Sequence, residues 1–151
     1  MNKIDRLQTT IEADYALWCA QQGALLRAGR LDALDRENLA EEIESLGRSD
    51  RREIENRMKV LLVHLLKWAY QPAGRSGSWR SSIREQRGRI AKLLDESPSL
   101  GGYPAQILAE EYGYARSDAA DETGLAENSF PSACPFDIAQ VLDPAWLPEA
   151  E

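Results

Sequence analysis

Apolar side chains recur every three or four residues along most of this chain, which is the spacing of an amphipathic α-helix. The spacing predicts a first helix from about Asp5 to Ala28, ended by Gly29, and a second helix that starts after Asp35 and ends at Gly47. The inward positions of these helices are Ile11, Tyr15, Trp18, Gln22 and Leu25 in the first, and Leu39, Ile43 and Leu46 in the second.

Three further helices follow with the same spacing. A third helix is predicted over 49–71 and is stopped by Pro72, a fourth runs from about 78 to 97, and a fifth covers 103–123, with Gly124 as its stop. The inward positions are Ile54, Met58, Leu61, Leu62, Leu65 and Ala69 in the third helix, and Trp79, Ile83, Gln86, Ile90, Leu93 and Leu94 in the fourth.

The last stretch, 125–151, is rich in loop-forming residues and has one short predicted helix at 137–142. It carries Phe130, Phe136 and Trp146, and a disordered tail has little use for three large aromatic side chains. No run alternates apolar and polar residues for long enough to predict a strand. We therefore expect an all-α fold: a compact helical bundle of five to six helices in a single domain, residues 1–151, with the loop-rich C-terminal segment packed back on it.

Charge is segregated along the chain, although the net charge is only −7. Residues 48–92 carry twelve basic and four acidic side chains, whereas residues 93–151 carry one basic and twelve acidic. The basic block has an arginine stripe on the fourth helix, Arg80, Arg84 and Arg87, whose spacing places the three on one face. Guanidinium groups suit carboxylate and phosphate ligands, so this face is a candidate surface for an acidic partner. The alternative is that the acidic flanks, including the fifth helix, neutralise the stripe within the chain.

A second candidate lies on the third helix. Helical spacing places Arg57, His64, Trp68 and Gln71 along one edge of its core stripe. With Trp79 and Gln86 of the next helix, this edge could form a pocket wall in which His64 is the titratable group. The alternative is the rim of a core, in which the same residues satisfy one another's polar groups.

Glu42 is the candidate carboxylate of that pocket, and we expect it to pair with Arg57 or His64 across a helix interface. A metal site made by Glu42 and His64 is disfavoured, because the chain has one histidine and no Glu-x-x-His motif. No cofactor is implied, since the chain has no P-loop, no Gly-x-Gly-x-x-Gly and no His-Glu-x-x-His. Cys19 and Cys134 lie far apart without a Cys-x-x-Cys.

The N-terminus has no secretory h-region and no stretch is apolar enough to span a membrane, so a cytoplasmic protein is expected. Nucleic acid is not favoured as a partner, because the pI is 4.9 and no helix-turn-helix, RNA-binding or zinc-finger signature is present. The oligomeric state stays open.

Three linked motifs carry a family resemblance: NLAEEIESLGRSDRREIENR at 38–57, HLLKWAYQP at 64–72 and SWRSSIREQR at 78–87. Together they resemble the DUF29 family, a bacterial domain of unknown function, over about Asp14 to Pro148. The resemblance implies a small all-helical protein and brings no catalytic or binding residues with it.

Two functions follow as hypotheses. The first is a non-catalytic interaction or regulatory module that uses the basic face of the third and fourth helices against an acidic partner. The second is a small-molecule or enzymatic pocket around Glu42, His64, Trp68, Trp79 and Gln86. We favour the first, because the charge segregation is a property of the sequence itself, whereas the pocket requires a particular packing of helices.

Overall fold

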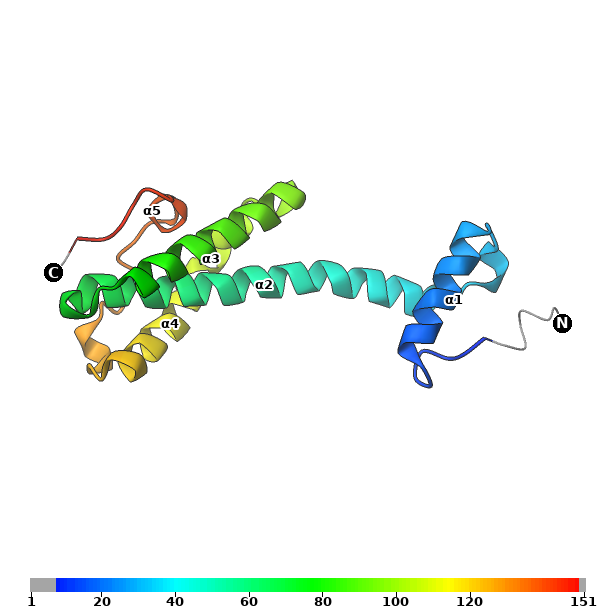
Figure 1. The fold of residues 1–151 in the computed structure, drawn as a ribbon, viewed down its shortest axis with the longest axis horizontal. Coiled ribbons are helices and arrows are strands. Elements are labelled where there is room, and N and C mark those ends of the chain that lie inside the picture. The colour runs from blue at the N-terminus through cyan, green and yellow to red at the C-terminus, as the bar shows by residue number, and fades with distance from the viewer. Residues whose placement is uncertain (1–7, 150–151) are drawn as a thin grey trace. The chain divides into compact units, whose positions relative to one another are not determined.

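A computed structural model describes residues 8–149, and within that range the chain has five α-helices and no strand (Figure 1). The all-α prediction is therefore confirmed. No helix in this range is both long and apolar enough to cross a membrane. The helices are α1 (Tyr15–Arg27), α2 (Arg36–Tyr70), α3 (Gly77–Glu96), α4 (Tyr103–Thr123) and α5 (Ile138–Leu142), with single 3-10 turns between them.

The chain divides into two compact units, residues 1–48 and residues 49–151, and the division falls inside α2. We describe the two units separately. The expectation of a single domain stays a prediction.

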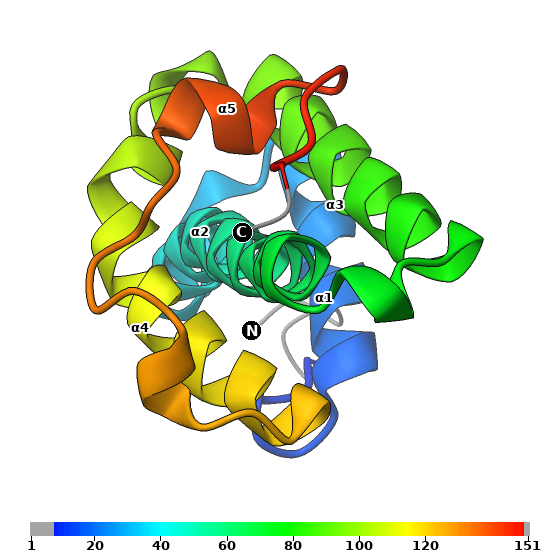
Figure 2. The same ribbon diagram turned by 90° about the vertical axis from the view of Figure 1, so that its left-hand side faces the viewer.

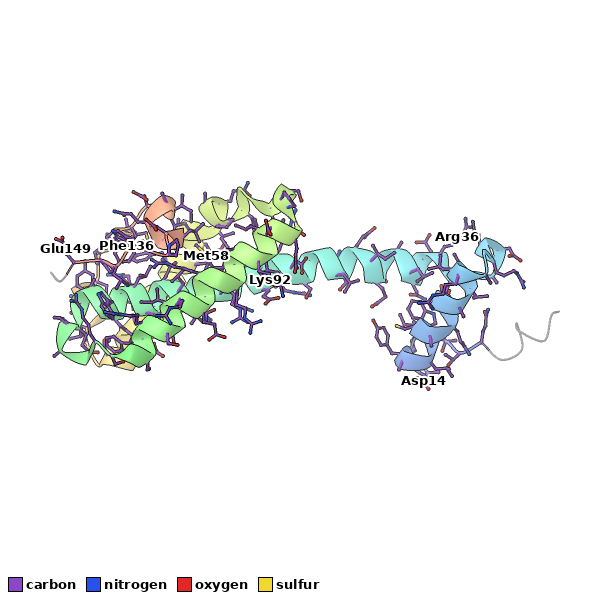
Figure 3. The ribbon with its side chains drawn as sticks, turned by 45° about the horizontal axis from the view of Figure 1, so that its top comes forward. Asp14, Arg36, Met58, Lys92, Phe136 and Glu149 are labelled. Carbon is purple, nitrogen blue, oxygen red and sulfur yellow. The ribbon has the colours of Figure 1, made fainter. Side chains whose placement is uncertain are left out.

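In the N-terminal unit, α1 begins later than the sequence predicts. The predicted start near Asp5 lies outside the described residues, but residues 8–14 are not helical. Thr10 explains part of this, because its hydroxyl accepts the backbone N–H of Ala13 and so competes with helical hydrogen bonding. The helix starts after Asp14 (labelled in Figure 3), whose carboxylate accepts the N–H of Leu17 at 3.0 Å.

Asp35, at the start of α2, joins that helix to α1. Its carboxylate accepts the indole N–H of Trp18 at 3.0 Å and the side-chain amide of Asn38 at 2.8 Å. Its own backbone N–H donates to the buried Gln22 side chain at 2.8 Å. Trp18 and Gln22 are therefore core residues as predicted. The polar atoms of both side chains hydrogen-bond Asp35 and so hold the start of α2 against α1.

The predicted second and third helices are one continuous helix, α2, so the predicted helix end at Gly47 is wrong. A glycine that ends a helix normally adopts a positive φ, as Gly29 and Gly124 do here with φ of 71° and 75°. Gly47 does not. Its neighbours are good helix formers, and one interior glycine costs only about 1 kcal/mol relative to alanine, which is too little to break the helix.

We therefore expect Gly47→Ala to stabilise the protein by about 0.5–1 kcal/mol. A Cβ atom at this position would meet no heavy atom within 4 Å, so the gain in helix propensity has no steric cost. Urea denaturation followed by circular dichroism measures the effect. A loss of stability would contradict a continuous helix through this residue.

The predicted inward stripe Leu39, Ile43 and Leu46 is only partly confirmed. Ile43 and Leu46 are 65% and 69% exposed, and Leu39 is half-buried. The reason lies in how α1 packs: it contacts the neighbouring flank of α2, where the hydroxyl of Tyr15 donates to Glu42 at 2.5 Å.

The C-terminal unit is built around residues 49–70 of α2. Seen along α2 in Figure 2, α3 and α4 lie on either side of it, and the tail crosses from the end of α4 to α3. All the predicted inward positions of the 49–71 segment are buried, and Ile83 and Ile90 of α3 join them. Met58 and Phe136, both labelled in Figure 3, belong to this core.

The tail packs back on the helices, as predicted. Phe130, Phe136 and Val141 are buried, and Phe136 makes an edge-to-face contact with Trp146 at 5.4 Å between ring centres. A capping box stabilises the start of α5: Asp137 accepts the N–H of Gln140, and the Gln140 side chain accepts the N–H of Asp137. The tail runs beside α3, so that residues 142–147 lie next to the arginine stripe.

Candidate binding site on helix α3

The three arginines of the predicted basic face have different roles. Arg87 is only 5% exposed, and each of its nitrogens already donates to a backbone carbonyl of the tail. Nε donates to Val141 and Nη1 to Trp146, both at 2.8 Å, and Nη2 donates to Gln140 at 3.2 Å. Burial lowers the pKa of this guanidinium, and the charge of Asp143 opposes that effect. Arg87 is therefore a structural residue that holds the tail.

Arg80 and Arg84 are exposed and free to meet a partner. The Arg84 side chain makes no hydrogen bond, ion pair or ring contact with any described residue, and Arg80 contacts only the ring of Trp68. Both line a pocket of about 460 Å³ between α3 and residues 142–147, which we call the α3–tail pocket. The other side chains that line it are mostly apolar: Ile83, Ala91, Leu142, Pro144, Ala145 and Leu147.

The acidic α4 does not neutralise these arginines. Its carboxylates pair with lysines of α2 instead: Asp118 lies 3.8 Å from Lys59, and Glu122 lies 3.9 Å from Lys67. Within residues 8–149, no carboxylate lies within ion-pair distance of Arg80 or Arg84. The alternative that the fifth predicted helix, α4, neutralises the arginine stripe therefore does not hold for Arg80 and Arg84. Their positive charge is available to a ligand.

A second pocket of about 500 Å³ adjoins the first through Arg80, which lines both. Trp68 lines it and is 7% exposed. The guanidinium carbons of Arg75 and Arg80 lie 4.9 Å and 5.4 Å from the Trp68 ring centre, within cation–π range. Arg75 also donates through Nε to the backbone carbonyl of Trp68 at 2.8 Å, which holds it against the end of α2.

His64 lies apart from this site. It lines a hollow of about 270 Å³ together with Lys59, Asp118 and other residues of α2 and α4, and its Nδ1 is 2.8 Å from the carbonyl oxygen of Val60. No serine, threonine or cysteine hydroxyl or thiol lines this hollow. The geometry thus offers His64 a backbone partner and acidic neighbours, without a nucleophile for it to activate.

The remaining residues of the predicted pocket are also dispersed. Gln86 is buried and accepts a hydrogen bond from Arg57 at 3.2 Å, and Arg57 reaches Glu53 at 3.6 Å. Trp79 packs on the core, with the ammonium of Lys67 4.7 Å from its ring centre. Of the six residues proposed for one pocket, only Arg57 and Gln86 are joined by a hydrogen bond, which is the arrangement expected of a polar core rim.

Glu42 does not pair with Arg57 or His64. It accepts the Tyr15 hydroxyl, and it lies on the same helix as the two predicted partners, so it cannot face them across a helix interface. This hydrogen bond is the largest cause that raises the pKa of Tyr15 to about 12. Among residues 8–149, no group of three or more histidine, cysteine or acidic side chains is placed to hold a metal ion.

The site residues that the sequence did not single out belong to the tail. Leu142, Pro144, Ala145 and Leu147 supply one wall of the α3–tail pocket. The aromatic residues of the tail predicted that it would pack on the helices. They did not predict that it packs against α3, because that choice depends on tertiary contacts.

The fold and site together define an all-α protein with an apolar pocket, rimmed by arginines, between α3 and the C-terminal tail. The family model described as a domain of unknown function, DUF29, matches residues 10–147. The chain therefore belongs to the DUF29 family, as its three motifs predict. Comparison with curated proteins and with solved structures found no match.

Proposed function

We propose that the chain is a non-catalytic binding module that takes an acidic, partly apolar segment of another protein into the α3–tail pocket. The observation that carries this proposal is the pair Arg80 and Arg84, exposed beside an apolar pocket and without a carboxylate partner among residues 8–149. A carboxylate of the partner would form charge-assisted hydrogen bonds with these guanidiniums, while apolar side chains fill the pocket.

The lining of the pocket favours a protein partner over nucleic acid. Apolar side chains such as Ile83, Leu142 and Leu147 supply most of it, and the phosphates that dominate contacts with a nucleic-acid backbone would use the arginines but not these side chains. The chain's net charge of −7 also opposes the approach of a long polyanion, whereas a short acidic segment engages mainly the local positive field. We place this partner in the cytoplasm, where the free thiols of Cys19 and Cys134 would stay reduced.

Peptide selection tests the proposal, because the partner sequence is unknown. A random 12-residue library is displayed and selected on the full chain. Binders are then measured on two variants, each of which removes two positive charges from α3. The test variant is Arg80→Gln with Arg84→Gln. The control is Arg89→Gln with Lys92→Gln, since these side chains pair only with Glu85 and Glu96 of the same helix.

We expect the enriched peptides to combine acidic with apolar residues. Their affinity should fall at least tenfold in the test variant, about 1.4 kcal/mol, and change less than threefold in the control. Equal losses in both variants would show non-specific attraction and would contradict a defined site. Duplex DNA is measured in the same way. If it binds with a steeply salt-dependent affinity, and only the test variant loses that binding, the partner is a nucleic acid and the protein proposal fails.

A further inference from the structure

The pocket at Trp68 has a feature that a carboxylate-binding surface alone does not explain. Arg75 and Arg80 bring two positive charges against the same indole ring, with guanidinium carbons 4.9 Å and 5.4 Å from its centre. Both side chains line this one pocket, so a ligand in it meets two positive charges, and an anion there would be attracted by both. Within residues 8–149, neither guanidinium has an ion-pair partner.

Arg75 supplies a second, independent observation. Its Nη2 atom is buried, and no acceptor of the described residues lies within hydrogen-bond distance. Leaving a buried charged donor without an acceptor is costly, and nearly all such groups in folded proteins have a partner. Arg75 also lines the pocket at Trp68, so an acceptor bound there would satisfy this donor after a rotation of the guanidinium.

We infer that the pocket formed by Trp68, Arg75, Ser76, Gly77 and Arg80, the Trp68 subsite, binds a dianionic oxyanion of the phosphate-monoester type. A carboxylate would balance only one of the two guanidiniums, whereas a phosphate dianion balances both and has oxygens for each. Gly77, in the first turn of α3, also lines the pocket, and the positive end of the helix dipole adds to the attraction.

The subsite adjoins the α3–tail pocket, because Arg80 lines both. A phosphorylated side chain of the partner is one source of the oxyanion, and in that form the inference rests on the proposed function. A small phosphate compound is the other source and needs no protein partner. The shared chemistry is testable with inorganic anions alone.

The first experiment titrates inorganic phosphate, sulfate and acetate into the ¹⁵N-labelled full chain at constant ionic strength. The resonances of the Trp68 indole N–H and the Arg75 Nε–H report on the subsite directly. We expect saturable shifts of both with phosphate and with sulfate, and only small linear shifts with acetate. In Arg80→Gln, the affinity for phosphate should fall about tenfold, while Arg89→Gln should match the wild type.

Shifts that are the same for all three anions, or that persist unchanged in Arg80→Gln, would overturn the inference. A second experiment distinguishes the source of the phosphate, by comparing a selected acidic peptide with its phosphoserine form. Tighter binding of the phosphopeptide, lost in Arg80→Gln, assigns the subsite to a phosphorylated partner. Saturable phosphate binding without any peptide binding would keep the subsite and reject the proposed function.

Discussion

Arg87→Ala should destabilise the C-terminal unit by about 3 kcal/mol, the largest effect that we expect from any single residue of α3. The substitution removes the donors for the carbonyls of Gln140, Val141 and Trp146. Those of Gln140 and Val141 belong to α5, and the loss of charge-assisted bonds at a buried site typically costs several kcal/mol. Urea unfolding measures the loss, and amide hydrogen exchange should show that protection disappears first in the tail, 137–149.

Arg84→Ala is the matched control for this prediction. It removes the same side chain one helical turn earlier, where the guanidinium makes no hydrogen bond or ion pair with any described residue, and should change the free energy of unfolding by less than about 0.5 kcal/mol. Equal effects of the two substitutions would contradict the structural role of Arg87. Because Arg87 holds one wall of the α3–tail pocket, binding studies that substitute it would change the shape of the site together with its charge.

Asp35→Ala should have the largest effect in the N-terminal unit, about 2–3 kcal/mol. The carboxylate caps the start of α2 and accepts the indole N–H of Trp18, a residue that is 2% exposed. Loss of a helix cap costs about 1 kcal/mol, and a buried donor left without an acceptor costs about 1–3 kcal/mol more. Hydrogen exchange of the Trp18 indole N–H and of the α1 amides would report the loss, and Asp35→Asn, which keeps one acceptor oxygen, should be milder.

The same site predicts a pH dependence. The hydrogen bond from the Asn38 side chain, followed by that from Trp18, lowers the pKa of Asp35 below its usual value. A lowered pKa in the folded state means that the stabilisation is complete above the pKa of the unfolded chain, about 3.9, and is lost as the pH falls through the folded value. The difference between wild type and Asp35→Ala should therefore shrink below about pH 4. A difference that stays constant down to pH 2 would contradict this assignment.

The elements with strong end signals could be predicted from the sequence. Pro72 ends α2 within one turn of its predicted stop, and Gly124 ends α4 at the predicted residue, because both signals act on local backbone conformation. The end predicted at Gly47 was wrong because glycine only permits a positive φ and does not require it. Burial of the apolar stripe also depended on distant contacts: the pattern of Leu39, Ile43 and Leu46 is helical, but α1 packs on the adjacent flank.

In the candidate site, the sequence predicts which residues share a helix face but not which of them are exposed. The spacing of Arg80, Arg84 and Arg87 places all three on one face of α3, yet the tail covers Arg87 and leaves the other two exposed. Nothing local distinguishes them, since the difference comes from carbonyls more than fifty residues away. Likewise, His64 and Trp68 are one turn apart on α2, but they line different pockets.

The most direct test of the binding proposal is where an acidic peptide binds. Chemical-shift mapping of a selected acidic–apolar peptide on the ¹⁵N-labelled full chain would locate it. We expect the largest shifts at Arg84, Leu142 and Leu147, and we expect them to vanish in the Arg80→Gln, Arg84→Gln variant while the tail resonances keep their native positions. Shifts centred on the His64 hollow, or shifts that the double variant retains, would contradict the α3–tail pocket as the binding site.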